Sequence, residues 1–137
     1  MNKIPFQLKH GLIFILVTLV YRGNSTILKN CIFDTGAAGT TFDSDFVAPI
    51  GIVASPASRI RRLATIGGYE RVFTHELDQL SIGDAVFKQI EIEVGDLTSK
   101  FAIDGIIGVD VIQKFNWVMD FTSSQLIPSL PSAQGRA

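Results

Sequence analysis

Residues 12–33 carry the pattern that most restricts the fold of this chain. Two apolar stretches rich in β-branched and aromatic side chains, residues 12–21 and 25–33, are separated by Arg22-Gly23-Asn24. Such stretches favour strands, and a turn that contains Gly and Asn tolerates the positive φ angles of a tight hairpin. The sequence therefore predicts a buried β-hairpin at the start of the domain.

The first of these stretches has a second interpretation. Lys3 and Lys9 precede the apolar residues 11–20, as in the charged and hydrophobic regions of a signal peptide. Residues 11–20 are too few to span a bilayer as a helix, and no cleavage site of small residues follows them. A strand is favoured, so a membrane location is not expected. The cytoplasm is the expected compartment, with export or anchoring through residues 11–20 as the alternative.

The rest of the chain is also β-rich. Further strands are predicted at residues 40–42, 59–66, 69–80, 85–94, 101–108, 117–121 and 125–127, with short helices around residues 46–48 and 109–115. In residues 85–94, the alternation places Val86, Ile90 and Ile92 on one face, and Glu91 and Glu93 on the other. These patterns predict an all-β fold, a small closed β-barrel at residues 11–127. Residues 1–10 are then an N-terminal segment and residues 128–137 a flexible tail.

Composition argues against several classes of partner and cofactor. Twelve basic and thirteen acidic residues give a net charge of −1, without a basic run, so nucleic acid is not an expected partner. One cysteine and two histidines make a structural metal site improbable, and no cofactor is expected. The single cysteine also fits a reducing compartment. With 47% hydrophobic and 18% charged residues, the chain is more apolar than a small monomer needs, which favours a partner chain that covers part of the surplus.

Three short motifs stand out in this framework. The second strand of the hairpin leads into Asp34-Thr35-Gly36-Ala37, so a carboxylate enters a turn of small residues that other backbone can approach closely. Taken alone, this motif is also compatible with an ordinary turn in which the Asp34 carboxylate accepts hydrogen bonds from local N–H groups. Ile66-Gly67-Gly68 lies at the tip of a predicted hairpin, and Ile106-Ile107-Gly108 directly precedes a predicted helix.

The order and spacing of these motifs resemble a subunit of the retropepsin-like aspartic proteases, over residues 11–127. The resemblance implies an acid-protease fold with one or two short helices. It also implies that Asp34 is catalytic, that Thr35, Gly36 and Ala37 support it, and that Ile107 and Gly108 pack beneath the loop. Ile66, Gly67 and Gly68 would form a flap that binds the substrate peptide as an added strand.

The chemistry of this family requires two carboxylates. One ionised and one protonated group hold a single water, and two such groups about 3 Å apart share one proton because they cannot both ionise. This chain has one Asp-Thr-Gly motif, so the second carboxylate must be Asp34 of another copy on a two-fold axis. The prediction is a homodimeric aspartic endopeptidase acting on peptides or proteins. The alternative is a dimer of the same fold that binds peptides but cuts them poorly or not at all.

The chain departs from the retroviral members in ways that carry a prediction. Ala38 and Gly39 stand where those enzymes commonly have two Asp residues, and Val109 stands where they have Arg, so both partners of an ion pair are missing together. The chain looks closer to cellular or bacterial members. Ala37 stands where many relatives have Ser, which removes a hydrogen bond to the ionised dyad and shifts the expected activity optimum toward weakly acidic or neutral pH.

Overall fold

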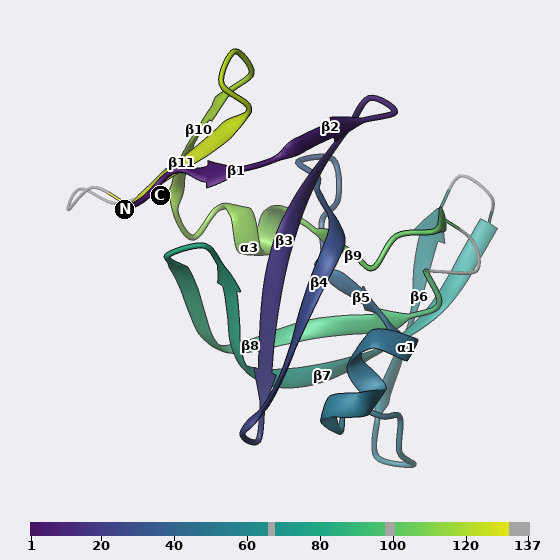
Figure 1. Cartoon of the computed structure of the whole chain (residues 1–137). Helices are drawn as coiled ribbons and strands as arrows, with labels where there is room; N and C mark the ends of the chain where they lie inside the picture. Colours follow the sequence, from purple (N-terminus) through teal and green to yellow (C-terminus); the bar gives the residue numbers. More distant parts are fainter. Residues whose placement is uncertain (66–67, 98–100, 132–137) are drawn as a thin grey trace.

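The computed structural model of the chain describes residues 1–65, 68–97 and 101–131 (Figure 1). It is mostly β-strand, which confirms the predicted all-β class. The strands are β1 (Ile4–Pro5), β2 (Gln7–Lys9), β3 (Leu12–Tyr21), β4 (Asn24–Phe33), β5 (Thr41–Asp43), β6 (Arg59–Thr65), β7 (Gly68–Ile82), β8 (Ala85–Gly95), β9 (Gly105–Ile107), β10 (Asn116–Asp120) and β11 (Gln125–Ser129). The helical segments of the described residues include α1 (Ser44–Val47), the 3-10 helix η1 (Ala48–Ile50) and α3 (Val109–Ile112).

Most of these strands form one sheet that closes on itself. Their order is β2-β3-β4-β9-β5-β8-β7-β6, and β3 also pairs with β7 through Thr18↔Ser81 and its two neighbouring pairs. The extra pairing joins the two sides of the sheet into the predicted small barrel. The interior is apolar, and its fully buried side chains include Leu19, Leu28, Phe42, Leu77 and Leu80. Burial of these side chains is the main stabilising contribution to such a fold.

The predicted first hairpin is present as β3 and β4. Tyr21 pairs with Asn24, so the turn consists of Arg22 and Gly23, with φ angles of 48° and 80°. Two successive positive φ angles are typical of a type I′ turn, whose twist matches that of the flanking strands. The stretch at residues 12–21 is therefore a strand. Among the described residues, no helix combines the length and hydropathy needed to cross a bilayer.

Strand β8 differs from the predicted alternation. Val86 is 40% exposed, whereas Phe87 is buried and Ile90 and Ile92 point inward. Gln89 adopts a φ of 51°, and the buried positions change from odd to even numbers at this residue. The strand thus changes which of its faces points to the core. Glu93, predicted to face outward, is buried.

Some element boundaries also differ from the prediction. The strand expected over residues 101–108 is confined to Gly105–Ile107, because Ala102 has a φ of 55° that interrupts extended backbone. Helix α3 ends at Ile112 instead of residue 115. Asp43 caps helix α1, since its Oδ2 accepts the Asp45 amide at 3.0 Å.

Both ends of the described chain meet in a second, smaller sheet, with the order β1-β11-β10. Ile4 pairs with Leu126, and the two ends lie side by side in Figure 1. Ile4 and Phe6 belong to the main core, and β11 continues through Ser129. The folded unit therefore extends on both sides beyond residues 11–127. Residues 132–137 of the predicted tail lie outside the described residues.

Candidate active site

Asp34 stands at the end of a buried central strand. Strand β4 runs parallel to β9, with Phe33 opposite Ile107, and the Asp34 amide continues this ladder by donating to the Ile107 carbonyl at 2.9 Å. Cys31, Ile32 and Phe33 are buried, whereas Asp34 itself is only partly buried. The apolar residues anchor the strand in the barrel, so the carboxylate is held in place where the strand reaches the surface.

The backbone of the following turn is folded around this carboxylate. Gly36 donates its amide to Asp34 Oδ1 at 2.8 Å, and Ala37 donates to the Asp34 carbonyl at 3.2 Å. A Cβ atom on Gly36 would lie 3.2 Å from Asp34 Oδ1, a close contact for any side chain. An amide that donates to a carboxylate stabilises its ionised form. Thr35 and Gly36 are exposed in the single chain.

Gly108 packs directly under the loop that carries Asp34. A Cβ atom at this position would lie 2.7 Å from the Gly39 carbonyl carbon and 2.8 Å from the Ala37 oxygen, and would also overlap the Gly39 oxygen. The next residue, Val109, donates its amide to the Ala37 oxygen at 2.8 Å. Ile107 is fully buried. The structure therefore brings Asp34, Gly36, Ala37, Ile107 and Gly108 together around one loop.

Thr40 and Asp110 hold the same two segments together, and sequence reasoning did not find this contact. Thr40 Oγ1 donates to Asp110 Oδ1 at 2.7 Å and accepts the Gly108 amide at 3.0 Å. The Thr40 amide donates to Asp110 Oδ2 at 3.2 Å. Thr40 is fully buried, and Asp110 lies in the first turn of α3, where an anion is favoured. A hydroxyl residue that follows the Asp-Thr-Gly turn and an acid that opens the next helix were the available signals.

Asp104 and Cys31 form a buried pair beside the strand that carries Asp34. Asp104 Oδ2 accepts the Asn30 amide at 3.1 Å, and the Asp104 amide donates to the Asn30 carbonyl at 2.9 Å. Burial, together with the nearby Asp104 carboxylate, raises the pKa of the Cys31 thiol well above its usual range. Cys31 is therefore held as an unreactive thiol.

The predicted glycine-tipped hairpin is formed by β6 and β7. The strands pair from Arg59↔Thr74 to Thr65↔Gly68. Gly68 has a φ of 128°, and no atom lies within 4 Å of the position where a Cβ would stand. Tyr69 is 65% exposed beside it. Of the predicted tip residues, Ile66 and Gly67 lie outside the described residues.

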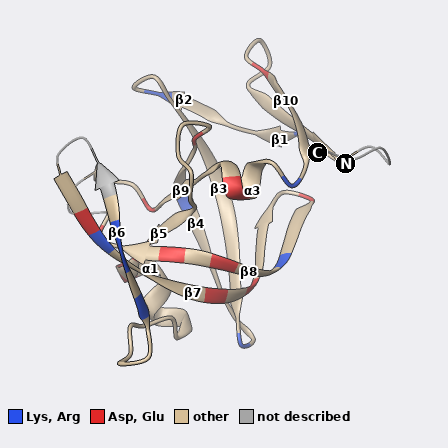
Figure 2. Ribbon diagram, turned by 180° about the vertical axis from the view of Figure 1, so that it is seen from behind, with Lys and Arg blue, Asp and Glu red and all other residues tan. Residues whose placement is uncertain are grey.

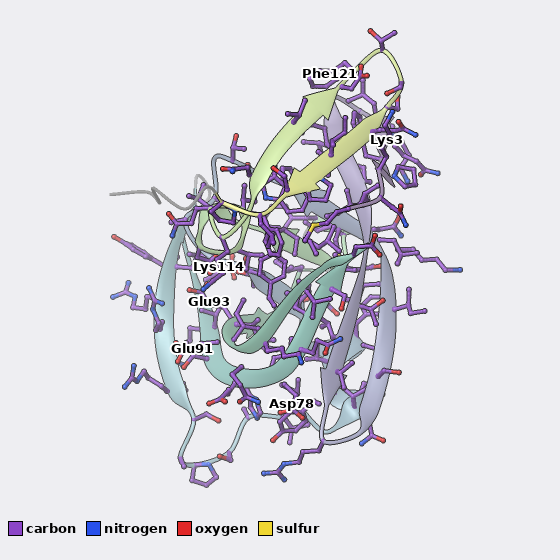
Figure 3. All side chains as sticks on the ribbon, turned by 90° about the vertical axis from the view of Figure 1, so that its left-hand side faces the viewer. Lys3, Asp78, Glu91, Glu93, Lys114 and Phe121 are labelled. Carbon is purple, nitrogen blue, oxygen red and sulfur yellow. The ribbon has the colours of Figure 1, made fainter. Side chains whose placement is uncertain are left out.

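An ion pair links this hairpin to the segment that follows Asp34. Arg61 on β6 donates from a terminal guanidinium nitrogen to Glu93 Oε1 at 3.0 Å, and Thr41 Oγ1 donates to Glu93 Oε2 at 3.3 Å. Figure 3 shows Glu93 on β8. The Glu93 side chain is 10% exposed and that of Arg61 57% exposed. A Cβ atom on Gly39 would stand 3.1 Å from Glu93 Oε1, so only glycine fits beside this carboxylate without a shift.

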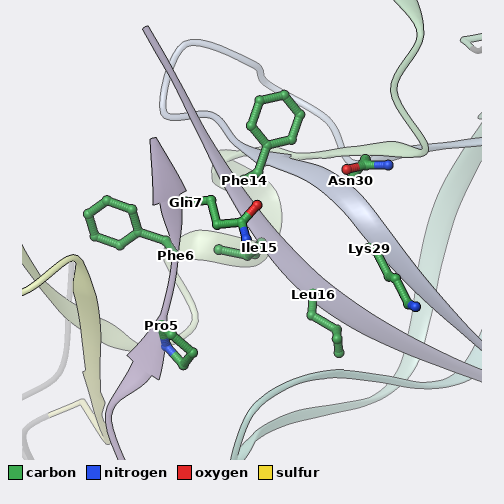
Figure 4. A pocket seen from close by; sticks show the side chains of 8 residues that line it. All are labelled: Pro5, Phe6, Gln7, Phe14, Ile15, Leu16, Lys29 and Asn30. Atoms are coloured by element: carbon green, nitrogen blue, oxygen red, sulfur yellow. The ribbon is translucent and has the colours of Figure 1, made fainter. Parts of the chain in front are cut away.

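The hollows in the described part of the chain include one beside the Asp34 loop and one beside β1 and β2. One, of about 360 Å³, adjoins the Asp34 loop and is lined by Phe33, Thr35, Ile112, Phe115, Trp117, Met119 and Leu126. The other, of about 440 Å³, lies between β1–β2 and β3–β4 and is lined by Phe6, Phe14, Leu16 and Lys29 among others (Figure 4). The second hollow contains no residue of the Asp34 loop, so the first is the one that bears on this site.

The described residues offer Asp34 neither a metal ion site nor a second carboxylate. No cluster of three or more His, Cys, Asp or Glu side chains is placed among them to hold a metal ion. The hydrogen-bond donor that they provide to the Asp34 carboxylate is the Gly36 amide. One chain thus presents a single carboxylate, oriented by backbone groups and accompanied by the exposed Thr35.

Comparisons with known proteins agree with this geometry. A sequence model of the aspartyl protease family matches residues 17–111, which is more than half of the chain. A crystal structure of a retropepsin-like aspartic protease from Rickettsia conorii superimposes with a TM-score of 0.66. It is 18% identical in sequence, and the match covers 93% of this chain and 99% of that one. The comparison with curated proteins found no match.

The family match spans the Asp34 loop, the β6–β7 hairpin and the Gly108 segment, and the structural match extends the likeness to almost the whole chain. The chain therefore belongs to the aspartyl protease family and has the retropepsin-like fold.

Proposed function

We propose that the protein is an aspartic endopeptidase that works as a homodimer, with one Asp34 from each subunit. The observation that carries the proposal is the position of Asp34 at the end of buried β4, with its Oδ1 bound by the Gly36 amide. The chain contains one Asp-Thr-Gly motif, and the acid–base chemistry of this family requires two carboxylates. A second copy supplies the missing group.

The proposed reaction is the addition of water to a peptide carbonyl. The ionised Asp34 takes a proton from the water as its oxygen bonds to the carbonyl carbon, and the protonated Asp34 of the partner gives its proton to the carbonyl oxygen. In the second step the tetrahedral intermediate collapses. The amide nitrogen accepts a proton from the dyad and the C–N bond breaks. One hydroxyl of the gem-diol gives its proton back to the dyad as the carboxyl C=O bond forms, so the dyad again shares one proton.

Features of the single chain support the position of the partner. Thr35 and Gly36 are exposed beside Asp34, and the adjoining 360 Å³ hollow is lined mainly by apolar side chains. Val118 of the nearby strand β10 is 61% exposed. An apolar surface next to a half-complete site is what a second copy would cover. The hairpin of β6 and β7 would close over the substrate as a flap, with its backbone pairing to an extended peptide.

Subunit mixing tests both parts of the proposal. A mixed peptide library identifies a substrate, and Asp34→Asn is then added to the wild-type protein under conditions that allow subunits to exchange. If each site needs two Asp34 side chains, equal amounts reduce the total activity to about one half, and a ninefold excess of Asp34→Asn reduces it to about one tenth.

Asp45→Asn is the matched control, because Asp45 is an exposed acid on α1, and the same excess of this variant must not reduce activity. Activity that is unaffected by excess Asp34→Asn would contradict the shared dyad. Equal cleavage by pure Asp34→Asn and wild type would overturn the aspartic mechanism. Peptide binding without cleavage at any pH would favour the alternative, a peptide-binding module.

A further inference from the structure

One face of the barrel connects the neighbourhood of Asp34 to the Arg61–Glu93 ion pair. Ile32, Ile106, Thr41 and Glu93 stand opposite one another on β4, β9, β5 and β8. Directly opposed residues in a sheet present their side chains on the same face. Asp34 follows Ile32 by two residues, which places its side chain on that face as well. This row of four residues runs from apolar near Asp34 to charged at its far end.

The length of the row corresponds to a short stretch of peptide. Strands in a sheet lie about 4.8 Å apart, so Ile32 and Glu93 are separated by about three spacings, or roughly 14 Å. An extended peptide advances about 3.3 Å per residue. A peptide that crosses the strands from Asp34 therefore reaches the ion pair after about four residues.

At that point the substrate would meet Arg61 before Glu93. Both Glu93 oxygens accept hydrogen bonds, from Arg61 and Thr41, and its side chain is only 10% exposed. The Arg61 side chain is 57% exposed, and a guanidinium has five N–H donors. Glu93 is the acceptor that the described residues offer to Arg61, which leaves donors directed to solvent.

The hairpin around Arg61 has an excess of positive charge. Arg59, Arg61, Arg62 and Arg71 lie within residues 59–71, against Glu70 as the acid in that range. Figure 2 shows the basic residues along β6 and acidic ones on β8, which is separated from β6 by β7. The whole chain has a net charge of −1, so this excess is local. A local positive field favours an anionic group over a cationic one.

We propose that Arg61, positioned by Glu93, is a specificity site for an acidic side chain of the substrate, about four residues from the cleaved bond. The inference rests on the proposed endopeptidase function. Planar guanidinium groups bind carboxylates through paired, charge-assisted hydrogen bonds. Glu93 holds Arg61 in position and does not itself touch the substrate.

The test uses a peptide that the wild-type protein cleaves, with Glu, Gln or Lys placed in turn at each of the four positions on either side of the cut. We expect kcat/KM for Glu to exceed that for Gln by about tenfold at one position, as a charge-assisted hydrogen bond at a half-exposed site allows. Arg61→Gln reduces this ratio to about one, Arg61→Lys keeps part of it because the charge remains, and Glu93→Gln lowers it by loosening Arg61.

Arg62→Gln is the matched control. It removes the same charge from the next residue of β6, whose side chain leaves on the opposite face and lies 4.3 Å from the centre of the Tyr69 ring. This variant must keep the wild-type ratio of Glu to Gln. A preference that survives Arg61→Gln, a preference that is lost equally in Arg62→Gln, a preference for Lys, or the absence of any preference would overturn the inference.

Binding to Asp34→Asn separates this inference from the proposed catalysis. Isothermal titration calorimetry gives the dissociation constants of the Glu and Gln peptides. Asp34→Asn should bind the Glu peptide about tenfold more tightly than the Gln peptide, and Asp34→Asn with Arg61→Gln should bind both equally. If the wild-type protein cleaves no peptide of the library, the endopeptidase proposal fails. The same ratio, measured with Glu and Gln variants of a library peptide that the protein binds, then keeps the specificity site. If the peptides are cleaved but Glu is not preferred over Gln, the endopeptidase proposal stands and the specificity site fails. Failure of Asp34→Asn to bind any of the peptides would overturn the specificity site.

Discussion

Thr40 and Asp110 are joined by two hydrogen bonds, one from the Thr40 hydroxyl to Oδ1 at 2.7 Å and one from the Thr40 amide to Oδ2 at 3.2 Å. Thr40 ends the loop that begins at Asp34, and Asp110 opens α3. The pair therefore ties the loop to the segment beneath it. This contact lies close to the place where retroviral relatives would have the Asp–Arg ion pair that this chain lacks at Ala38 and Val109.

Thr40→Val should destabilise the fold. The substitution keeps the shape of the side chain but removes a buried hydroxyl, so the Gly108 amide loses its acceptor and Asp110 loses a donor. Unsatisfied buried groups cost about 1–3 kcal/mol, and the free energy of unfolding in urea measures this loss. Thr40→Ser keeps the hydroxyl and should recover most of it. An unchanged urea midpoint in Thr40→Val would contradict the role assigned to this hydroxyl.

Gly108→Ala should displace the Asp34 loop. The added methyl group would overlap the carbonyl groups of Gly39 and Ala37, which are backbone atoms and cannot turn aside as a side chain does. Overpacking of this kind costs about 1–3 kcal/mol. Activity should fall by more than the stability loss explains, because the loop carries Asp34. Val109→Ala, a neighbouring substitution at a 37% exposed side chain, is the control for both measurements and should change little.

Ala37→Ser should move the acid limb of the pH–rate profile to lower pH. A hydroxyl that donates to the ionised carboxylate stabilises that form and lowers its pKa, so the base remains ionised in more acidic solution. The wild-type protein should therefore work best at weakly acidic or neutral pH. Profiles of kcat/KM against pH for wild type, Ala37→Ser and the control Ala38→Ser provide the measurement. A wild-type maximum below about pH 3 would refute the prediction.

Cys31 should be protected from alkylation in the folded protein. Burial raises the pKa of its thiol, and the Asp104 carboxylate adds to this, so thiolate is scarce and enclosed. Iodoacetamide at pH 8 should label Cys31 only slowly, and labelling should become fast in urea. Rapid labelling of the native protein would show that the thiol is accessible.

The raised pKa of the Cys31 thiol also predicts a loss of stability in alkali. The unfolded thiol ionises around pH 8.5, whereas the folded thiol keeps its proton, so the free energy of unfolding falls as the pH rises above that value. Urea unfolding at pH 7 and pH 10, compared between wild type and Cys31→Ala, isolates this contribution. An equal pH dependence of the two proteins would assign the loss to other groups.

Local sequence patterns were sufficient to predict most of the barrel. The β3–β4 hairpin and the strands from β5 to β8 are specified by β-branched and apolar residues and by turn residues close to them in the chain. The change of faces at Gln89 had no such signal, because a positive φ at a glutamine is imposed by the folded sheet. For the same reason Ile4 and Phe6 were assigned to a separate segment, although distant strands bury them.

In the candidate site, too, some features follow from local sequence motifs and others only from the folded sheet. Asp34, Gly36 and Gly108 stand in short motifs and were found from the sequence, as was the hairpin that Gly68 begins. The partnerships of Thr40 with Asp110 and of Arg61 with Glu93 join residues 70 and 32 positions apart. The pairings of β9 with β4 and β5 bring Thr40 and Asp110 together. The antiparallel pairings of β6 with β7 and of β7 with β8 bring Arg61 and Glu93 together. Glu93 was placed on the outer face because charged residues are seldom buried without a partner, and its partner lies on another strand.

The contact of Gly108 with the carbonyl groups of Gly39 and Ala37 has a consequence for evolution. It is made by main-chain atoms, which every residue possesses, and the one strict demand it makes on the sequence is that residue 108 has no side chain. The spacing beneath Asp34 is thus independent of most surrounding side chains, which are free to drift as long as the barrel stays filled. Two proteins can then have the same fold while sharing few residues, as the 18% identity and the TM-score of 0.66 with the Rickettsia conorii protein illustrate.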